Sequence, residues 1–531
     1  MNPRYFPVRQ IRRVAILATL SATAMLAVSQ ASAQPIPQFI QDQGLTNTNI
    51  GRAAIGVQVT CAELIAIGAN DPAGTGEENE LWRRCNELVV TAVEFNNDAP
   101  GADPNRRTLG YCDASGCQGD DAKAANLLAA FQQVNGEEAQ ASANLSQTAS
   151  YDQFSTIGAR LTALRGAGSS SITSVAANSA DLMYGSGGGA AADSAMPFGP
   201  WGWFVRGTYT SGERDPSDAT SFSGQENGFD YDQYGVTIGI DRRSGNAVWG
   251  FALGYNSYEI EMQTVAPAAI TQNSVVEGGT IEADSVNGTF FYDVASQNNV
   301  YFSALAGYGT QSFDMLRNFV YFEQNAPNAT VTDQQRLMIA DPDGDSVAAA
   351  FTLGRSMFSG SLVFDPYIGL TYDRVTIDSF AEGDSGNTAE NQNLGGMELA
   401  FDEQTIDSLR SRLGFQISNN VNTSFGSVRP MFSAEWFHEF EDDVRTIRAK
   451  YALEESLAAN NQGNFTAGFG AGCVSCFDII SEAPETDYFV VGLGIAATTQ
   501  RGFQSFLMLE GLLGHSYLSA YALTVGLRGQ F

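Results

Sequence analysis

A change of hydrophobic period at Trp201 constrains the fold of this chain more than any other feature. From this residue on, apolar side chains stand at every second position, and Trp249, Phe251, Leu253 and Tyr255 alternate with small or polar residues. Such a period predicts β-strands with one apolar face. A water-soluble sandwich turns that face inward, whereas a membrane barrel turns it outward toward lipid. The alternation alone leaves both folds open.

The lengths of the connections distinguish the two folds. Tight turns such as 243–245 and 297–298 alternate with long connections such as 318–344 and 441–485. This difference is typical of outer-membrane barrels, whose short turns lie in the periplasm. The fold class is therefore mainly β, an antiparallel transmembrane barrel of about twelve strands, an even number as in bacterial barrels. The expected strands are 201–213, 228–242, 246–261, 283–296, 299–317, 345–358, 361–380, 404–418, 424–440, 486–498, 502–513 and 517–531.

The first 33 residues predict a secretory signal peptide. They carry arginines and no acidic residue, then an apolar run at 14–28 and the small-x-small site Ala31-Ser32-Ala33. We expect cleavage between Ala33 and Gln34 by the Sec route. No later stretch reaches the roughly 18 uninterrupted apolar residues of a membrane-spanning helix. An exported chain without such a helix spans a membrane only as a closed barrel.

The charge of the chain excludes one large class of function. Its net charge of -31 becomes more negative when the arginines of the signal peptide are removed. Nucleic-acid binding needs a basic surface, so we expect no nucleic-acid partner. Acidic loops fit a protein of the cell surface, and the 55 glycines favour β-structure with tight turns.

Six cysteines in an exported chain favour disulfides, because the compartment is oxidising. The spacing favours local pairs, although it leaves the connectivity open. Cys473 and Cys476 also have the spacing of a redox or zinc half-site, but no second CxxC or histidine cluster accompanies them. We therefore expect neither a metal nor a cofactor. The favoured pairs are Cys61 with Cys85, Cys112 with Cys117, and Cys473 with Cys476.

The part before the barrel has a helical pattern. The segments "TCAELIAIG" and "ELWRRCNELVVTAVEF" space apolar residues by three and four positions. We expect a short, cysteine-containing helical region at 34–150 that resembles an exported passenger. A pore helix followed by a Gly/Ser-rich linker is expected at 151–197, and the barrel domain at 198–531.

Charged residues within the expected strands predict a polar lumen, because charges at membrane depth must avoid lipid. A helix is about 10–12 Å wide. An eight-stranded barrel is filled by its own side chains and a sixteen-stranded one is open, so about twelve strands leave room for about one helix. Each charged residue either bonds such a helix or faces pore water. The expected pore-facing residues are Arg160, Arg165, Arg206, Asp241, Arg410, Arg412, Glu435, Glu510 and Arg528.

The last strand, "YALTVGLRGQF", is expected to pair with the first and so remove both sheet edges. It resembles the C-terminal signal of outer-membrane proteins, which alternates apolar residues and ends in an aromatic one. The resemblance implies recognition by the barrel-assembly machinery. The residues of this expected assembly signal are Tyr521, Leu523, Val525, Leu527 and Phe531.

Ordered motifs at the start of the barrel carry a family resemblance. "GPWGWFVRGTYTSGERD" and "NGFDYDQYGVTIGIDRRSGNAVWGFALGYNSYEIE" resemble the autotransporter β-domain of type V secretion, over residues 198–531. The resemblance implies a twelve-stranded barrel and a helix that threads its pore. "RLTALR" at 160–165 is similar to the family's pre-barrel segment. Self-cleaving members have an Asn-Asn pair in this helix, which "SYDQFSTIGARL" lacks, so we expect the N-terminal region to stay attached.

The expected function is that of a translocator in the outer membrane of a Gram-negative bacterium, exposing or anchoring its own N-terminal region. Its expected partners are the bilayer, the Sec translocon, periplasmic chaperones and the barrel-assembly machinery, with the chain itself a monomer. Two alternatives stay open: a structural plugged barrel without a passenger, and a hydrolase at the barrel rim. The hydrolase would use His438 or His515 with acids such as Asp442 and Asp443. We expect no catalytic residue, because the Gly-Asp-Ser triplets at 344–346 and 383–385 lack the context of a catalytic motif.

Overall fold

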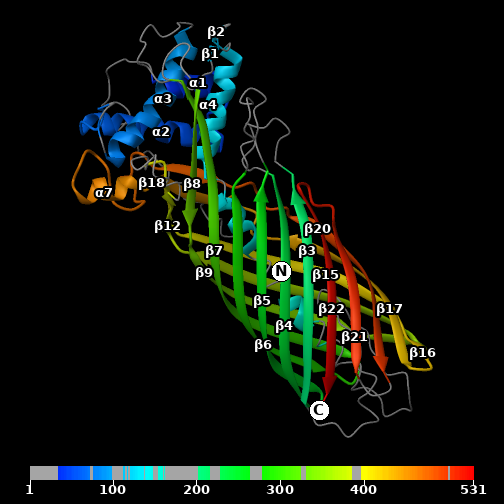
Figure 1. Cartoon of the computed structure of the whole chain (residues 1–531). Coiled ribbons are helices and arrows are strands. Elements are labelled where there is room, and N and C mark those ends of the chain that lie inside the picture. Colours follow the sequence, from blue (N-terminus) through cyan, green and yellow to red (C-terminus); the bar gives the residue numbers. More distant parts are fainter. Residues whose placement is uncertain are drawn as a thin grey trace, which may run out of the picture. The chain divides into compact units, whose positions relative to one another are not determined.

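In the computed structural model, twelve antiparallel strands close into a barrel (Figure 1). The ring is closed because the last strand pairs with the first, from Leu518 opposite Arg214 to Gln530 opposite Gly202. This confirms the predicted fold class. The barrel strands are β3 (Trp201–Arg214), β4 (Phe229–Ser244), β5 (Ala247–Met262), β6 (Thr280–Ala295), β7 (Val300–Gln324), β9 (Asp343–Arg355), β11 (Leu362–Ile377), β15 (Gln404–Asn419), β17 (Gly426–Glu439), β20 (Asp487–Thr499), β21 (Gln504–Leu513) and β22 (Leu518–Gln530).

The structure describes most of the chain after residue 33, with gaps. Within these residues, no helix is long and apolar enough to cross a membrane. The described residues are 34–71, 74, 76–97, 112–113, 116–117, 120–136, 138–146, 153–158, 161, 201–215, 228–263, 278–324, 331–384, 396–499 and 503–530.

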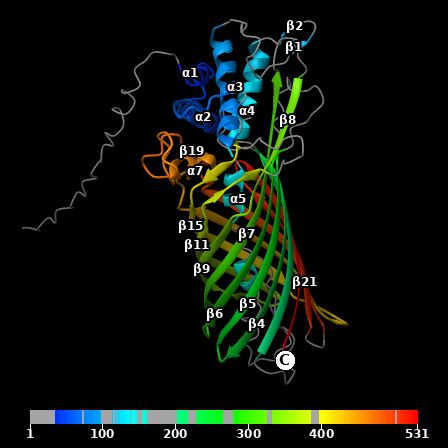
Figure 2. The same ribbon diagram turned by 60° about the vertical axis from the view of Figure 1, so that its left-hand side comes forward.

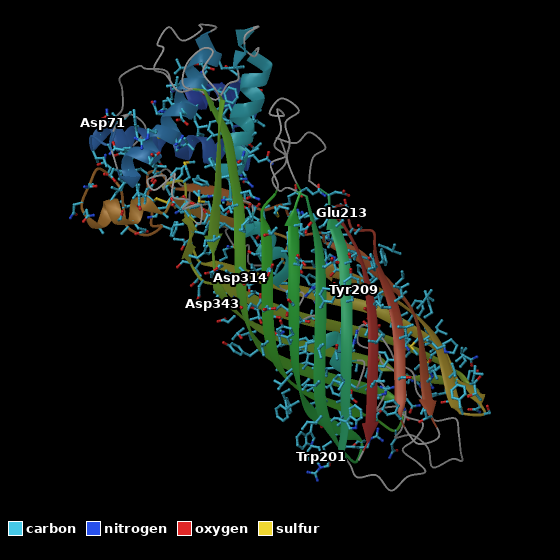
Figure 3. All side chains as sticks on the ribbon, viewed as in Figure 1. Asp71, Trp201, Tyr209, Glu213, Asp314 and Asp343 are labelled. Atoms are coloured by element: carbon cyan, nitrogen blue, oxygen red, sulfur yellow. A yellow bond between two sulfur atoms is a disulfide. The ribbon has the colours of Figure 1, made fainter. Side chains whose placement is uncertain are left out.

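Short turns join the strands at one end of the barrel. Gly245 and Gly360 adopt φ values of 64° there, a conformation that favours glycine. The other end carries the long connections, and we call it the extracellular end because loops on that side are longer in bacterial barrels. Figure 3 shows Trp201, Tyr209 and Glu213 in this order along β3, from the short turns toward the extracellular end.

The side chains show which face of each strand is apolar. Leu253 in the middle of β5 is 59% exposed on the outside, whereas its neighbour Ala252 is buried. Polar residues such as Asn256 and Asn287 are buried inside. The apolar face therefore points outward to lipid, the reverse of a soluble sandwich. Other outward apolar residues are Val236, Ile238, Phe251, Val286, Phe290, Phe302, Val347, Phe351, Ile368, Leu370, Leu413, Phe432, Leu493, Leu507, Leu523 and Val525.

The long connections contain elements that the sequence pattern did not reveal. β7 continues past the expected end at residue 317 and pairs with β8 (Val331–Ala340) as a hairpin beyond the ring. A separate four-stranded sheet has the order β12-β14-β18-β19. Strands of two to six residues carry too little periodicity to be recognised. These elements are β12 (Phe380–Ala381), β13 (Gly383–Asp384), β14 (Leu399–Phe401), β18 (Thr446–Tyr451), α7 (Leu453–Ala459) and β19 (Phe477–Ile480), with the short strands β10 (Met357–Ser359) and β16 (Val421–Thr423) at the opposite end.

The N-terminal part is helical. Thr48 caps the second helix by accepting a hydrogen bond from the Gly51 amide at 3.1 Å. Gly136, at φ 64°, separates the fourth and fifth helices. The elements are α1 (Pro35–Asp42), α2 (Asn49–Ala66), α3 (Glu77–Asn97), β1 (Cys112–Asp113), β2 (Gly116–Cys117), α4 (Asp120–Val134) and α5 (Glu138–Ser146), followed by helical residues at 153–158 and 161.

The outward direction of the apolar face predicts a depth-dependent cost of charge. Leu253→Arg should destabilise the barrel by about 2–4 kcal/mol, because position 253 lies in mid-strand against lipid. The control Val300→Arg, at the first residue of β7, should cost only about 0–1 kcal/mol. Urea titration of the barrel refolded in lipid vesicles measures both values. Equal costs for the two variants would show that Leu253 does not face the hydrocarbon layer.

Candidate functional site: the barrel lumen and its extracellular mouth

A helical segment at 153–158 and 161 occupies the lumen. The Gln153 side chain is bound at both ends to β6: its Nε2 donates to the Asn287 carbonyl at 2.9 Å, and its Oε1 accepts from Thr289 Oγ1 at 2.8 Å. All three residues are buried. Because a buried amide without partners would cost about 1–3 kcal/mol, these bonds fix the position of the segment against one strand.

Apolar side chains surround this segment and form what we call the lower ring. Phe154, Ile157 and Leu161 from the segment are buried against the barrel wall. A barrel interior is normally polar, so this layer marks where the helix replaces pore water. A Cβ at Gly307 would lie 3.1 Å from the Phe154 ring, which shows how closely the wall approaches. The wall residues are Phe204, Val248, Ala252, Phe291, Leu305, Ala348 and Ala350.

A second apolar layer, the upper ring, lies at the extracellular end of the lumen. Ala141 of α5 belongs to this cluster. The ring therefore contacts the chain at α5, before the helical segment at 153–158. The inward residues of this ring are Phe229, Tyr231, Ile260, Met262, Ile281, Phe313, Met315, Ala340, Val375, Ile377 and Ile406.

Charged groups in the lumen are paired. Arg412 donates to Thr352 Oγ1 at 2.8 Å and lies 3.7 Å from Glu435, which also accepts a hydrogen bond from Tyr367. Arg410 precedes Arg412 by two residues on β15 and lies 3.1 Å from Asp373. Pairing offsets part of the large cost of removing these charges from water.

The strand residues expected to face the pore all point into the barrel. Arg206 donates to Thr524 Oγ1 at 3.2 Å, and Arg528 donates to Gln504. Arg160 and Arg165 lie outside the described residues, so their role stays a prediction. The buried strand residues are Arg206, Asp241, Glu435, Glu510 and Arg528, while Arg410 and Arg412 are slightly exposed.

Other inward polar groups were not singled out from the sequence. Asp293 accepts from Ser303 at 2.7 Å, and Asp365 accepts from Tyr301 at 3.0 Å. Their place in the alternation of β6 and β11 could have identified them. Gln153 gave no such signal, because a single polar residue on a helix does not reveal its partners.

The helices dock on the extracellular connections of the barrel. We call helices α1–α4, the sheet β12-β14-β18-β19 and α7 the cap (Figure 2). One hydrophobic core joins Phe39 of α1 and Leu64 of α2 to Tyr451 of β18 and Ile479 of β19. Phe319, in the part of β7 beyond the ring, belongs to the same core. The helices thus complete their core with residues from the barrel domain.

Polar contacts reinforce the joint between α2 and the connection at 440–486. Asn49 donates to the Ile480 carbonyl at 2.9 Å and accepts from the Ile480 amide at 2.8 Å, so its side chain continues the pairing of β19. Glu454 is 1% exposed and accepts from Thr60 Oγ1 at 2.9 Å and from Ser475. Three separate segments therefore meet at one buried carboxyl group.

Arg317 fastens α4 to the mouth of the barrel. Its guanidinium makes a two-point contact with Glu382, at 2.8 Å and 2.5 Å. It also donates to the carbonyls of Gln133 at 2.7 Å and Met397 at 3.1 Å. A cation at the C-terminal end of α4 satisfies a carbonyl that the helix leaves unpaired.

Within the residues that the structure describes, two disulfides lie in or next to the cap. Cys61 and Cys85 join α2 to α3 with a Cα–Cα distance of 5.6 Å, and Cys473 and Cys476 close a small loop with 5.5 Å. The register of β1 and β2 sets the backbone of Cys112 opposite that of Cys117.

The two histidines do not form a catalytic pair with the expected acids. His438 lies on the outer face of β17, and its Nδ1 is 3.0 Å from Asp487, not from Asp442 or Asp443. His515 Nδ1 accepts the Leu518 amide at 3.2 Å, and burial lowers the pKa of His515 to about 4. Within the described part of the chain, no group of three or more His, Cys, Asp or Glu residues could hold a metal ion.

Comparison with known proteins identifies the family to which this barrel belongs. The family model "Autotransporter beta-domain" matches residues 203–474, about half of the chain. The chain belongs to the autotransporter β-domain family. Its barrel is an autotransporter β-domain in the outer membrane of a Gram-negative bacterium, and the lipid bilayer is its surroundings. No curated protein shows significant sequence similarity to the chain.

Solved structures of autotransporter domains resemble the chain at low identity. The translocator domain of NalP from Neisseria meningitidis is 13% identical with a TM-score of 0.42, over 64% of this chain and 90% of that domain. The β-domain of the Bordetella autotransporter BrkA is 15% identical with a TM-score of 0.36, over 62% and 100%. The transport unit of AIDA-I from Escherichia coli is 11% identical with a TM-score of 0.35, over 70% and 99%.

The contacts of the lumen segment predict that it seals the pore. Deleting 153–161 from the autotransporter β-domain protein should raise single-channel conductance in planar bilayers and lower the thermal midpoint of the barrel. The reason is that three buried apolar side chains, each worth about 1.5–3 kcal/mol, would be lost from the lower ring. Deleting 171–179, the same length of the Gly/Ser-rich segment, is the control. Equal conductance of both deletions would mean that the segment does not obstruct the pore.

The buried carboxyl of Glu454 predicts pH-dependent docking of the cap. Burial raises its pKa from 4.5 to about 7, against the opposing effect of hydrogen bonds from Ser475 and Thr60 and of the Lys450 charge. The docked state therefore holds the proton more tightly than the undocked state. The stabilisation of the docked state by this proton is complete below about pH 4.5 and is lost as the pH rises through 7.

The measurement is the thermal midpoint of the helical circular-dichroism signal on both sides of pH 7, which should be lower on the alkaline side. Glu454→Gln keeps an acceptor for Thr60 but cannot titrate, so it should reduce the pH dependence. Some pH dependence should remain because of Glu138, which lies near Arg317 and Glu382. Burial also raises the pKa of Glu138 to about 7. Unchanged pH dependence in the variant would exclude Glu454 as the titrating group.

Proposed function

We propose that this chain is an outer-membrane translocator that inserts as a β-barrel and anchors its own short N-terminal region at the cell surface. The observation that carries the proposal is the single hydrophobic core shared by helices α1–α4 and the extracellular connections of the barrel. Separating the N-terminal region from the barrel domain would expose this shared core to water, so the region is expected to remain attached.

The path of the chain supports this function. The cap lies with the long connections, α5 packs in the upper ring, and Gln153 binds the middle of β6. β3 then begins at Trp201, at the end with the short turns (Figure 3). The described residues thus lie first at the extracellular end, then in the lumen at 153–158 and 161, and then at the opposite end from Trp201, as expected for a region that has crossed through its own barrel.

Each part then has a physical task. The outward apolar band holds the barrel in lipid, and the paired charges keep the lumen wall stable without pore water. The two apolar rings and Gln153 hold the lumen segment and close the pore after transport. The contacts of the N-terminal helices with the rest of the cap keep these helices at the surface. The absence of an Asn-Asn pair in "SYDQFSTIGARL" supports retention without cleavage.

The remaining expectations complete the proposal. Residues 1–33 would direct Sec export and be removed before Gln34, the passenger-like region would be 34–150, the pore helix and linker 151–197, and the barrel domain 198–531. Periplasmic chaperones and the barrel-assembly machinery would act on the chain through its last strand, and the mature protein would be a monomer. Phe531, the end of this expected signal, lies outside the described residues.

The proposed role is not catalytic. Hydrolysis at the rim would require a histidine oriented by an acid and open to substrate. His438 meets its acid, Asp487, on the outer face of β17 beside Trp436, whose Nε1 donates to the same carboxylate at 2.9 Å. This is the position of an interfacial aromatic group, not of a pocket.

Labelling on intact cells tests the proposal. Asp71→Cys changes an exposed residue after α2 (Figure 3) and should react with a membrane-impermeant maleimide on whole cells. Ser244→Cys, exposed at the end of β4 beside a short turn, should react only after lysis. If Asp71→Cys also reacts only after lysis, the N-terminal region is not at the surface, and the chain is a plugged barrel without an exported passenger.

A further inference from the structure

A cavity of about 470 Å³ opens at the extracellular mouth, where its lining includes Phe229, Tyr231 and Ile406 of the upper ring and Ile447 of the core of the cap. It lies between the ends of β3, β4, β15, β17, β20 and β22 and the connection that leads to β18. Its volume falls within the range of small-ligand sites. The proposed anchoring function assigns it no task.

The charge of the lining is negative. Seven acidic residues and three arginines contribute to it. Arg214 is already paired with Glu482 at 3.3 Å, and Arg410 with Asp373 at 3.1 Å. The acidic residues are Glu403, Asp407, Glu439, Glu441, Asp443, Glu482 and Glu485.

Three of these carboxylates remain available to a ligand. Glu403, Glu441 and Asp443 are exposed, and within the described chain none of them forms an ion pair. A cation that enters the cavity therefore meets carboxylates whose charge is not yet neutralised.

One wall of the cavity is aromatic and already binds a guanidinium. The Arg214 guanidinium lies 4.3 Å from the centre of the Tyr517 ring. Phe229, Tyr231 and Tyr488 extend this wall. Aromatic faces attract cations, and the planar guanidinium most readily stacks on them.

A buried amide in the lining has an unmet hydrogen bond. Gln404, at the start of β15, is only 6% exposed, and its Nε2 has no hydrogen-bond partner in the described structure. A buried donor without a partner is costly, so it favours a ligand that brings an acceptor.

We propose that this cavity binds a basic peptide segment, with arginine side chains between the aromatic wall and the carboxylates of Glu403, Glu441 and Asp443, and a peptide carbonyl on Gln404. A divalent cation fits less well, because no group of three or more ligating side chains converges among the described residues. A polyamine would satisfy the carboxylates but has no acceptor for Gln404.

The test uses the full chain in nanodiscs of zwitterionic lipid and a fluorescein-labelled Ala-Arg-Ala-Arg-Ala peptide, followed by fluorescence anisotropy. The peptide should bind in a salt-sensitive manner, and the matched Ala-Glu-Ala-Glu-Ala peptide should not. The triple variant Glu403→Gln, Glu441→Gln, Asp443→Asn should weaken binding about tenfold, since three exposed charge pairs, each of them weak, would be lost together.

The control variant removes the same charge elsewhere. Asp314→Asn, Asp343→Asn and Asp345→Asn change exposed residues of β7 and β9 that do not line the cavity, and they should leave binding unchanged. Figure 3 labels Asp314 and Asp343. Both triple variants must show the heat-modifiable migration of the folded barrel. Equal weakening by the two triple variants would overturn the proposal, because binding would then follow net charge alone.

A second substitution separates a peptide from other cations. Gln404→Met should weaken binding of the arginine peptide about fivefold, as expected for one hydrogen bond, without changing the affinity for spermidine. An equal loss for both probes would contradict the contact with a peptide carbonyl. Displacement of the peptide by Mg²⁺, at concentrations where Na⁺ of equal ionic strength has no effect, would show a metal site instead and also overturn the proposal.

Discussion

Closure of the backbone hydrogen bonds is the constraint on which this structure depends. Lipid offers no partner to an unpaired amide, so a sheet in a membrane must have no edge. Here β22 meets β3 from Leu518 to Gln530, and every barrel strand thereby has two neighbours. The outward apolar residues can then face hydrocarbon, and polar side chains at the depth of the hydrocarbon layer turn inward.

Filling the inside follows from that closure. A ring of twelve strands encloses space that its own side chains do not fill. The chain fills it with its own segment, held by Gln153 and by the lower and upper apolar rings. Elsewhere in the lumen, charges such as those of Arg412 and Glu435 are paired side by side. The lumen therefore contains both apolar layers that exclude water and paired charges.

Outside the membrane, the chain again completes one part of its structure with residues from another part. The N-terminal helical region is small, and a small region buries a smaller fraction of its surface on folding than a large one. Its core is enlarged by Tyr451, Ile479 and Phe319 from the barrel domain, and fixed by a disulfide between α2 and α3. The long connections are thus both a platform for the cap and, beside it, the walls of an acidic and aromatic cavity.

The sequence alone determined the barrel, because period two and alternating connection lengths are local patterns that survive without knowledge of contacts. It also separated the helical region from the strands, and the cost of charge in lipid predicted that Arg206 and Glu435 face the lumen. The tertiary structure decided what those patterns cannot contain. Gln153 meets Asn287 across 134 positions, and Thr60 meets Glu454 across 394. Such contacts depend on the closed ring, which brings distant segments together, and no periodicity within either segment records them.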